Sequence, residues 1–181
     1  MKNLWRILII AIPLSLAAAS AGLDLVRISG NSMEPTLCTG HLVAIPATYI
    51  SRHLNPHIDS LVVTLDPVNR KQYIIKRVVA VGGDRVRIAH GQFVRNGDVV
   101  SEPYTCVTDF FDNWPYGSTK AGNESYAIPA GDVFLMGDNR TVSQDSRTLG
   151  AIPISELRGI VVARLPFSKK CPCATLQKVA P

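Results

Sequence analysis

Short apolar runs, separated by turn residues, occupy most of the chain after residue 25. These runs are rich in Val, Ile and Leu, and several end at proline or glycine, as strands commonly do. Between residues 85 and 88, charged and apolar residues alternate with a period of two, which is typical of a half-buried strand. Strands are therefore predicted at residues 42–45, 61–65, 73–81, 85–88, 92–95, 99–100, 133–136 and 160–165.

The signals between these runs favour antiparallel pairing. Asn96-Gly97 is a strong hairpin-turn signal between two of the predicted strands. Helix signals are few, and one helical turn is expected at residues 154–158. The pattern predicts a mainly β fold, in which an antiparallel β-sheet or barrel-like domain with few short helices follows a single N-terminal transmembrane helix.

The transmembrane prediction rests on residues 7–23, which carry no charge. Their length is near the minimum for one membrane-spanning helix. Lys2 and Arg6 precede them and favour a cytoplasmic amino terminus with an exported remainder. A cleavable signal peptide is the alternative, because residues 19–21 have the small-x-small pattern of a cleavage site. Both interpretations export the rest of the chain.

The sequence divides into three segments. Residues 1–24 form the membrane anchor or signal segment, residues 25–168 the β-rich domain, and residues 169–181 a C-terminal tail. Within the domain, residues 101–125 are rich in turn-forming and polar residues, so they are expected to leave the β core as a loop excursion. A chain of 181 residues suffices for one domain with a substantial core.

Charge and cysteine content narrow the possible partners. The net charge of +5 is scattered, which suits contact with membrane lipid. No nucleic-acid recognition motif is present, so nucleic acid is not an expected partner. Four cysteines in an exported domain allow three complete disulfide pairings, and the sequence leaves the pairing open among Cys38, Cys106, Cys171 and Cys173. A zinc site is less supported, because there is only one Cys-x-Cys pair.

Ser32 and Lys76 are the residues that could carry chemistry together. A serine hydroxyl attacks a carbonyl only when a base removes its proton, and none of the four histidines lies in a recognisable motif. A lysine with a pKa of about 10.4 is neutral roughly once in 2,500 molecules at pH 7. Burial among apolar groups lowers that pKa, and Lys76 lies in a β-branched run. Taken alone, the serine could cap a turn and the lysine could lie solvated at a sheet edge.

Three segments together resemble the type I signal peptidases, which are membrane-anchored serine–lysine proteases that remove signal peptides from exported proteins. Residues 32–37 (SMEPTL) resemble the nucleophile box of that family, and residues 76–84 (KRVVAVGGD) resemble its lysine box. A third box is matched by residues 137–140 (GDNR) together with Ser143 and residues 145–147 (DSR). Weaker likeness extends the match over most of residues 26–165.

The resemblance implies a role for each matching residue. Ser32 would be the nucleophile, and its backbone N–H would help bind the oxyanion, while Lys76 would be the general base. Ser143 would orient the lysine amine, supported by an ion pair between Asp145 and Arg147. The substrate would lie extended over shallow pockets that accept small side chains one and three residues before the cut. The expected substrate-binding residues are Ile28, Gly30, Met33, Leu37, Ile74 and Ile75.

The resemblance also implies preproteins as substrates, a monomeric enzyme in the plasma (inner) membrane, and no metal or organic cofactor. Departures from the family pattern include Gly30, where many members have a hydroxyl residue that helps bind the oxyanion, and His41, where an aspartate is usual. Two rival hypotheses remain: a self-cleaving repressor of the SOS type, and a silent membrane-tethered β domain that binds peptides. The sequence does not tell one dedicated client from many preproteins.

Overall fold

The computed structural model describes residues 22–46, 55–105, 125–165 and 171. Twelve strands and two short helices lie within these ranges. The strands are β1 (Leu23–Arg27), β2 (Leu42–Pro46), β3 (Leu61–Leu65), β4 (Tyr73–Val81), β5 (Arg85–Ala89), β6 (Gln92–Arg95), β7 (Asp98–Val99), β8 (Tyr126–Ala127), β9 (Asp132–Met136), β10 (Ile152–Pro153), β11 (Leu157–Ile160) and β12 (Ala163–Arg164). The helices are α3 (Ser146–Leu149) and a 3₁₀ turn, η1 (Ile154–Glu156).

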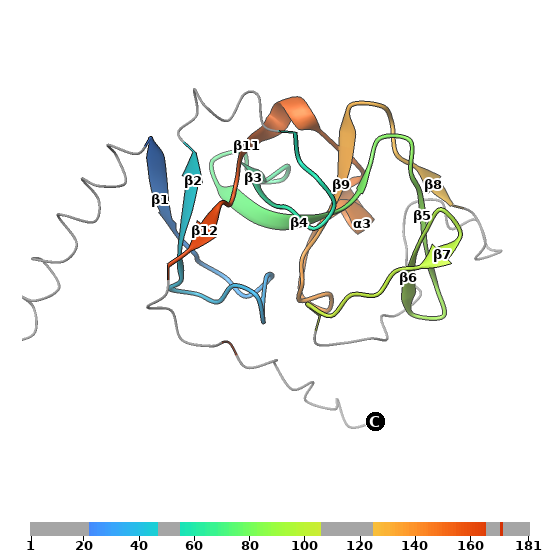
Figure 1. The fold of residues 1–181 in the computed structure, drawn as a ribbon, viewed down its shortest axis with the longest axis horizontal. Coiled ribbons are helices and arrows are strands. Elements are labelled where there is room, and N and C mark those ends of the chain that lie inside the picture. Colours follow the sequence, from blue (N-terminus) through green and yellow to red (C-terminus); the bar gives the residue numbers. More distant parts are fainter. Residues whose placement is uncertain (1–21, 47–54, 106–124, 166–170, 172–181) are drawn as a thin grey trace, which may run out of the picture.

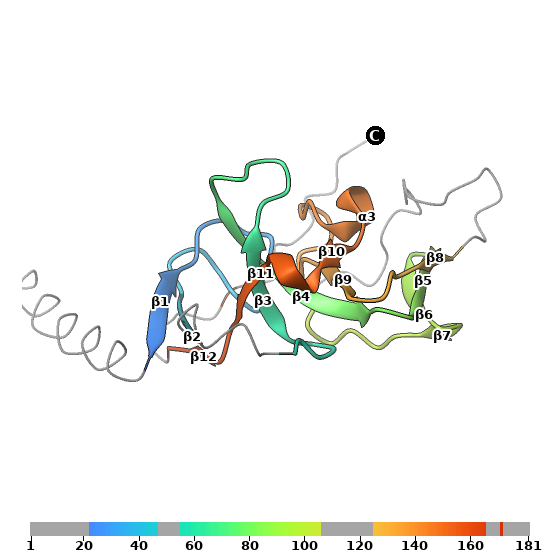
Figure 2. The same cartoon turned by 90° about the horizontal axis from the view of Figure 1, so that it is seen from above.

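The strands form three antiparallel sheets. Their orders are β1-β2-β12, β10-β9-β4-β3-β11 and β7-β6-β5-β8. Figures 1 and 2 show the three-stranded sheet at one end of the molecule and the four-stranded sheet at the other, with the five-stranded sheet between them. The mainly antiparallel β fold with few helices is therefore confirmed.

Strand β4 is at the centre of the five-stranded sheet, and both of its faces are covered. Val78 packs in one apolar cluster with Val62 and Leu135, whereas Val79 packs in another with Phe93 and Phe134. A strand covered on both faces needs apolar residues at successive positions rather than at alternate ones. This explains the continuous apolar run at residues 78–81, and it places Lys76 beside the core.

Two of the predicted elements differ from the structure. The single strand predicted at residues 160–165 is wrong, because β11 pairs with β3 and β12 pairs with β2, in a different sheet. The chain changes sheets at Val161 and Val162, whose amides bond to Leu61 O and Ala44 O. The helical turn predicted at residues 154–158 is shorter, because the chain enters β11 at Leu157.

The ends of the chain and the loop excursion fall largely beyond the described ranges. The predicted membrane segment lies outside the described residues up to position 21, and its last residue, Leu23, begins β1. No helix in the described ranges is both long and apolar enough to cross a membrane. Most of the excursion (residues 106–124) and all of the tail except Cys171 also lie outside the description.

Replacement of Phe134 by alanine is expected to lower the free energy of unfolding by about 3–5 kcal/mol. The ring is fully buried between β9 and the β5–β6 hairpin, so its loss leaves a cavity. Chemical denaturation monitored by fluorescence measures the change. Val99→Ala is the control, because this side chain is 57% exposed and its loss should change stability by less than about 0.5 kcal/mol. Equal effects of the two substitutions would contradict the assignment of the core.

Candidate active site

Ser32 lies on a loop between β1 and β2, which we call the serine loop (residues 28–41). Two backbone hydrogen bonds close its neck, from Ile28 N to His41 O (2.8 Å) and from Gly40 N to Ile28 O (2.9 Å). Within the loop, Leu37 N donates to Met33 O (2.8 Å), and both of these side chains are buried. The half-buried Ser32 is therefore next to an anchored residue rather than at a free loop tip.

The segment that follows β9 docks directly onto the serine loop. Asn139 N donates to Ser32 O (3.0 Å), and the Asn139 side-chain amide donates to Asn31 O (3.2 Å). Gly137 allows this close approach. A Cβ atom at that position would lie 2.5 Å from Ser32 O and would also overlap the Ser143 side chain. The third sequence box thus packs against the candidate nucleophile, and the packing requires glycine at position 137.

Lys76 lies on β4, opposite Val62 of β3, and is only 4% exposed. Burial lowers the pKa of its amine below the ordinary lysine value, because a charged amine loses hydration inside the protein. The negative charge of Asp145 opposes this shift, and the positive charge of Arg147 adds to it. Burial is the dominant cause, so the pKa shift is in the direction that a lysine base requires.

Asp145 and Arg147 form a compact ion pair at the start of α3. The Asp145 carboxylate caps the helix by accepting from Arg147 N, and it also accepts from Arg147 Nε (2.8 Å) and Nη2 (3.0 Å). Gly137 N donates to the same carboxylate (2.9 Å). Arg147 Nη2 further donates to Ser143 O (3.2 Å). The pair therefore fixes the backbone on both sides of the segment that contains Ser143.

Ser143 does not make the hydrogen bond to the lysine amine that the resemblance implied. Its hydroxyl is buried and has no hydrogen-bond partner among the described residues. The backbone is held by Ser143 N donating to Asn139 O (3.1 Å), and the side chain packs on Gly137. A buried hydroxyl without a partner is uncommon and costs free energy, so it marks a position where a ligand or a moving side chain could supply one.

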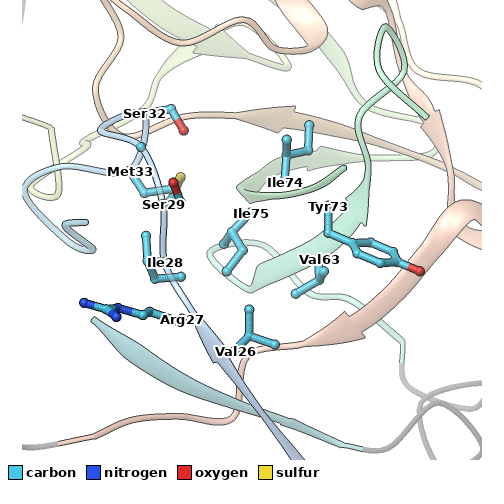
Figure 3. Close-up of a pocket in the computed structure, with 11 residues that line it drawn as sticks. Val26, Arg27, Ile28, Ser29, Ser32, Met33, Val63, Tyr73, Ile74 and Ile75 are labelled. Atoms are coloured by element: carbon cyan, nitrogen blue, oxygen red, sulfur yellow. The ribbon is translucent and has the colours of Figure 1, made fainter. Parts of the chain in front are cut away.

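A narrow pocket runs from Ser32 between the serine loop and β4 (Figure 3). Its volume is about 90 Å³, and it contains five of the six expected substrate-binding residues: Ile28, Gly30, Met33, Ile74 and Ile75. Leu37 is the exception. It is 1% exposed and packs in the core with Val43, because its backbone bond to Met33 turns the loop inward at that point. Leu37 supports the pocket from behind rather than lining it.

Sequence reasoning missed several pocket residues. Val63 faces the pocket from β3, where it pairs with Ile75 of β4. Tyr73 lies at the start of β4, and Val26 lies on β1 two residues before Ile28. The alternation of Val26 with Ile28 could have indicated a shared face. The pairing of Val63 with Ile75 could not have been read from either segment alone.

Arg77 was also missed, although it is next to Lys76. Its guanidinium forms a buried two-bond ion pair with Asp138 (2.8 and 2.7 Å) and donates to Asp59 O (3.0 Å). The same group stacks on the Tyr104 ring at 3.9 Å. A weaker contact of 3.4 Å reaches Thr36 Oγ1 on the serine loop. Arg77 therefore connects the lysine strand to both of the other sequence boxes.

Glu102 and Tyr104 join the start of the excursion to this network. Glu102 forms a two-bond ion pair with Arg140, whose Nε donates to Gly137 O (3.0 Å). Burial is the main cause of a raised pKa at Tyr104, and the negative charge of the Glu102 carboxylate adds to it. The phenol therefore stays neutral and donates to Glu102 Oε1 (2.9 Å). These contacts also hold the segment around Gly137.

Gly30 is not a free oxyanion donor in this arrangement. Its backbone N–H donates to Thr39 Oγ1 (3.0 Å), and the Thr39 hydroxyl donates in turn to Gly30 O (3.0 Å). The positive φ of +101° at Gly30 is a backbone conformation that favours glycine. The Gly30–Thr39 pair ties the two arms of the serine loop together just before Ser32.

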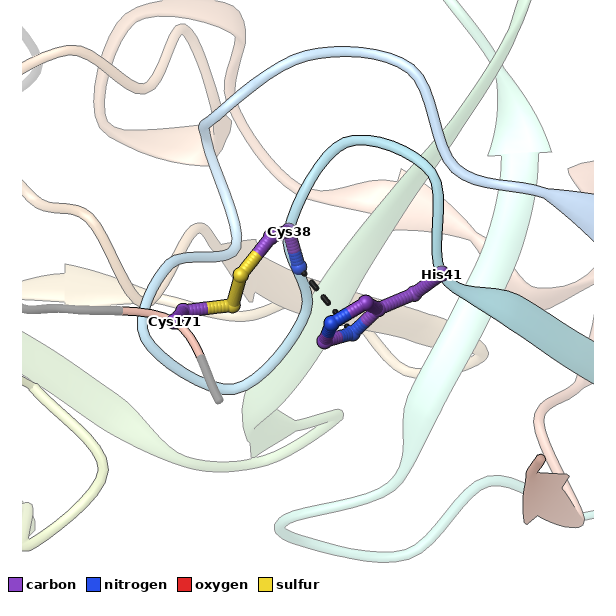
Figure 4. A group of neighbouring side chains, drawn as sticks. All are labelled: Cys38, His41 and Cys171. Atoms are coloured by element: carbon purple, nitrogen blue, oxygen red, sulfur yellow. Dashed lines mark hydrogen bonds between the residues drawn. A yellow bond between two sulfur atoms is a disulfide. The ribbon is translucent and has the colours of Figure 1, made fainter. Parts of the chain in front are cut away.

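Cys38 and Cys171 are joined by a disulfide, which settles one of the pairings that the sequence left open (Figure 4). Their Cα atoms are 5.8 Å apart, which is ordinary for such a bridge. His41 lies beside them, and the ligand atoms of the three side chains are within 4.8 Å of one another. Sulfurs that are bonded to each other are not thiolate ligands, so we assign the cluster as a disulfide. Cys106 and Cys173 lie outside the described residues.

Comparison with known proteins identifies the family. The family model described as "Signal peptidase, peptidase S26" matches residues 1–166. Signal peptidase I of Bacillus caldolyticus is 30% identical over 154 residues, which is 78% of this chain and 79% of that protein. Signal peptidase IB of Staphylococcus aureus is 32% identical over 151 residues, which is 78% of each chain.

A solved signal peptidase I from Enterococcus faecalis is also similar, with 23% identity and a TM-score of 0.46 over 60% of this chain and 97% of that one. The family model and the two curated relatives carry the conclusion. The chain belongs to the peptidase S26 family of signal peptidases and is therefore a serine endopeptidase. The resemblance seen in the sequence is confirmed at this level.

Gly137→Ala is expected to reduce peptidase activity about 100-fold, because the added methyl group would push the serine loop away from the segment after β9, and displacements near 1 Å can cost that much. Initial rates of peptide cleavage measure the effect, with circular dichroism and melting temperature to verify the fold. Gly159→Ala is the matched control, since its nearest contact would be an ordinary 3.6 Å from Ile45 Cβ. Full activity in folded Gly137→Ala would contradict the close-packing argument.

Proposed function

We propose that the chain removes N-terminal signal peptides from exported preproteins through an acyl-enzyme on Ser32, with Lys76 as general base. The observation that carries the proposal is the enclosed amine of Lys76, whose pKa is lowered by burial on the strand beside the serine pocket. Family membership supports the reaction class. A serine hydroxyl needs a neutral base to remove its proton, and a neutral lysine amine can be that base.

Each step can be written with the side chains of this chain. The Ser32 hydroxyl attacks the carbonyl carbon of the scissile bond, and the neutral Lys76 amine takes the hydroxyl proton. The proton then passes to the leaving amine, which releases the mature protein and leaves the signal peptide as an ester on Ser32. Lys76, again neutral, removes a proton from the water that attacks the ester. The bond to Ser32 Oγ then breaks, the proton passes from Lys76 to that oxygen, and the signal peptide leaves with a free carboxyl end. The backbone N–H of Ser32 is the proposed donor to the oxyanion.

Ser143, Asp145 and Arg147 are proposed to position the base. The Ser143 hydroxyl has no partner among the described residues, and hydrogen bonds in catalytic sites commonly tighten only when substrate binds. The proposed bond to the Lys76 amine would give this hydroxyl a partner. Arg147 occupies the Asp145 carboxylate with two side-chain bonds, which limits how far that carboxylate can favour the protonated lysine.

The pocket supports a preference for small side chains one and three residues before the cut. At about 90 Å³ it is smaller than the cavity of about 150 Å³ that accommodates benzene in a protein core. Its walls are mainly aliphatic, and extended substrates can pair with backbone while pockets select alternate side chains. A bulky residue at either position would have to displace the wall formed by Ile28, Ile74 and Ile75.

The proposed enzyme acts at a membrane surface. Residues 7–23 are proposed as a single membrane anchor with the amino terminus in the cytoplasm and the catalytic domain outside it, in the plasma (inner) membrane. It would act as a monomer on preproteins, in contact with lipid and without metal or organic cofactor. Specialisation for one client of a secretion or conjugation system is compatible with the same site.

Ser32→Ala and Lys76→Ala are each expected to lower kcat/KM for a preprotein by about 10⁴-fold or more, because nucleophile and base act as one unit. The measurement is cleavage of purified preproteins in detergent, with the new amino termini mapped. Preproteins with Ala at positions −3 and −1 should be cut, and those with Leu at both should not. Lys71→Ala is the control for loss of a lysine, because this residue is exposed and lies before β4. Full activity of either active-site variant would refute the assignment.

Activity is expected to rise with pH up to the lowered pKa of Lys76 and then to level off. The sign follows from the mechanism: only the neutral amine accepts the serine proton, so each pH unit below that pKa costs about tenfold in kcat/KM. A pH–rate profile between pH 5 and 10 provides the measurement. Melting temperatures measured over the same pH range distinguish a loss of activity caused by protonation from one caused by unfolding. A profile that stays flat from pH 5 to 9 would exclude a titrating amine base.

A further inference from the structure

The Cys38–Cys171 disulfide, which we call the tether, joins the serine loop to a distant part of the chain. Neither cysteine has a part in the chemistry proposed above. Cys38 ends the stretch that begins at Ser32, directly after the buried Leu37, and its sulfur is bonded to Cys171, 133 residues later in the chain. Cys171 follows β12, which pairs with β2. The bridge therefore connects the loop to a segment of the chain that follows the three-stranded sheet (Figure 4).

His41 lies next to the bridge and fixes the backbone of Cys38. Cys38 N donates to His41 Nδ1 (3.2 Å), and His41 N donates to Cys38 O (3.1 Å). The imidazole is 4% exposed, and its Nδ1 must be unprotonated to accept this bond. The histidine and the bridge therefore occur together at the end of the serine loop.

The tether acts on one arm of the serine loop, while Asn139 and Gly137 hold the other. On the amino-terminal side of the serine loop, Asn139 is bonded to Asn31 O and Ser32 O. The carboxyl-terminal side runs from Ser32 to Cys38. Thr36 in this second side contacts Arg77 at only 3.4 Å. Without the bridge, this side keeps noncovalent contacts alone among the described residues: the burial of Leu37 and its bond to Met33 O, the Gly30–Thr39 pair, the two backbone bonds at the neck of the loop, the His41 bonds, and the contacts of Thr36 with Arg77 and Arg164.

We propose that the Cys38–Cys171 disulfide, together with His41, is a positioning element for Ser32, so that acylation depends on the oxidised bridge. This inference rests on the proposed function, because it takes Ser32 as the nucleophile. Reduction by a dithiol transfers two electrons and two protons, breaks the Sγ–Sγ bond and leaves two protein thiols and the oxidised dithiol. The serine loop then loses its covalent anchor, and the hydroxyl of Ser32 is less often aligned with the base.

The first arm of the test measures activity in the full-length protein. Cys38→Ser/Cys171→Ser, and the wild type after dithiol treatment, are expected to lose about tenfold or more in kcat while KM changes little. Dithiol should have no further effect on the double variant, which serves as its own control for the other cysteines. His41→Ala is expected to lower kcat as well, and His41→Asp, which restores an acceptor for Cys38 N, to recover part of it.

The second arm measures hydrogen exchange and does not depend on activity. When the bridge is broken, the amides of Gly30 and Leu37 in the serine loop should exchange faster, whereas the core amide of Val78, bonded to Ser60 O, should not. Equal acceleration at all three amides would mean that the bridge only stabilises the whole fold, and this would overturn the inference. So would unchanged kcat in the double variant, or free Cys38 and Cys171 with one equivalent of zinc in non-reduced protein.

The two proposals fail in different ways. If the oxidised protein shows no Ser32-dependent cleavage, the proposed function is refuted and the catalytic part of this inference falls with it. The exchange arm would still decide whether the bridge holds the serine loop. If oxidised protein cleaves through Ser32 and the double variant cleaves equally well, the proposed function stands and the tether is refuted.

Discussion

The exclusion of water from the Lys76 amine is the constraint on which the site depends. An ammonium group that is enclosed by protein loses hydration that apolar neighbours do not replace, so the neutral form is favoured. A nearby carboxylate without hydrogen-bond partners would oppose this effect, because its negative charge favours the protonated amine. Asp145 is a carboxylate whose charge does raise the pKa of Lys76. Its oxygens are already bonded to Arg147 and to Gly137 N, which explains why burial remains the dominant influence.

Buried polar contacts connect the strand that carries this amine to the serine loop. Strand β4 carries Lys76 on one face and Arg77 on the other, and Arg77 fastens the strand to Asp138. The two neighbours of Asp138 in the chain contact the serine loop: Gly137 by close packing and Asn139 by hydrogen bonds. Removing one partner of a buried ion pair commonly costs about 3–5 kcal/mol, so the Arg77–Asp138 pair is a structural requirement of the site rather than part of the chemistry.

Much of this arrangement could be predicted from local sequence, because local sequence determines strands and turns. The predicted strand at residues 61–65 matches β3, and the one at 73–81 matches β4, since both are apolar runs ended by Pro or Gly. The strand predicted at 160–165 was wrong, because apolar character does not reveal that the chain changes sheets at Val161. Leu37 was taken for a pocket residue for a similar reason: its direction is set by the fold of the serine loop.

Contacts between distant segments could not be predicted from the sequence alone. Arg77 and Asp138 both lie in recognised boxes, but nothing local indicates that they pair. The Cys38–Cys171 bridge was one of several pairings that the cysteine count allowed. The Ser143 hydroxyl was expected to bond to the lysine amine, and its lack of a described partner depends on how closely it packs on Gly137. Each of these outcomes depends on tertiary geometry at the scale of a single hydrogen bond.

The lowered pKa of the Lys76 amine can be tested without any substrate. Protein labelled with carbon-13 at the lysine Cε positions would be titrated by NMR, with Lys76→Arg to assign the signal. The Lys76 resonance is expected to titrate well below the ordinary lysine pKa of about 10.4. A Lys76 amine that titrates at or above that value would be protonated at neutral pH, and this result would contradict its proposed role as the base.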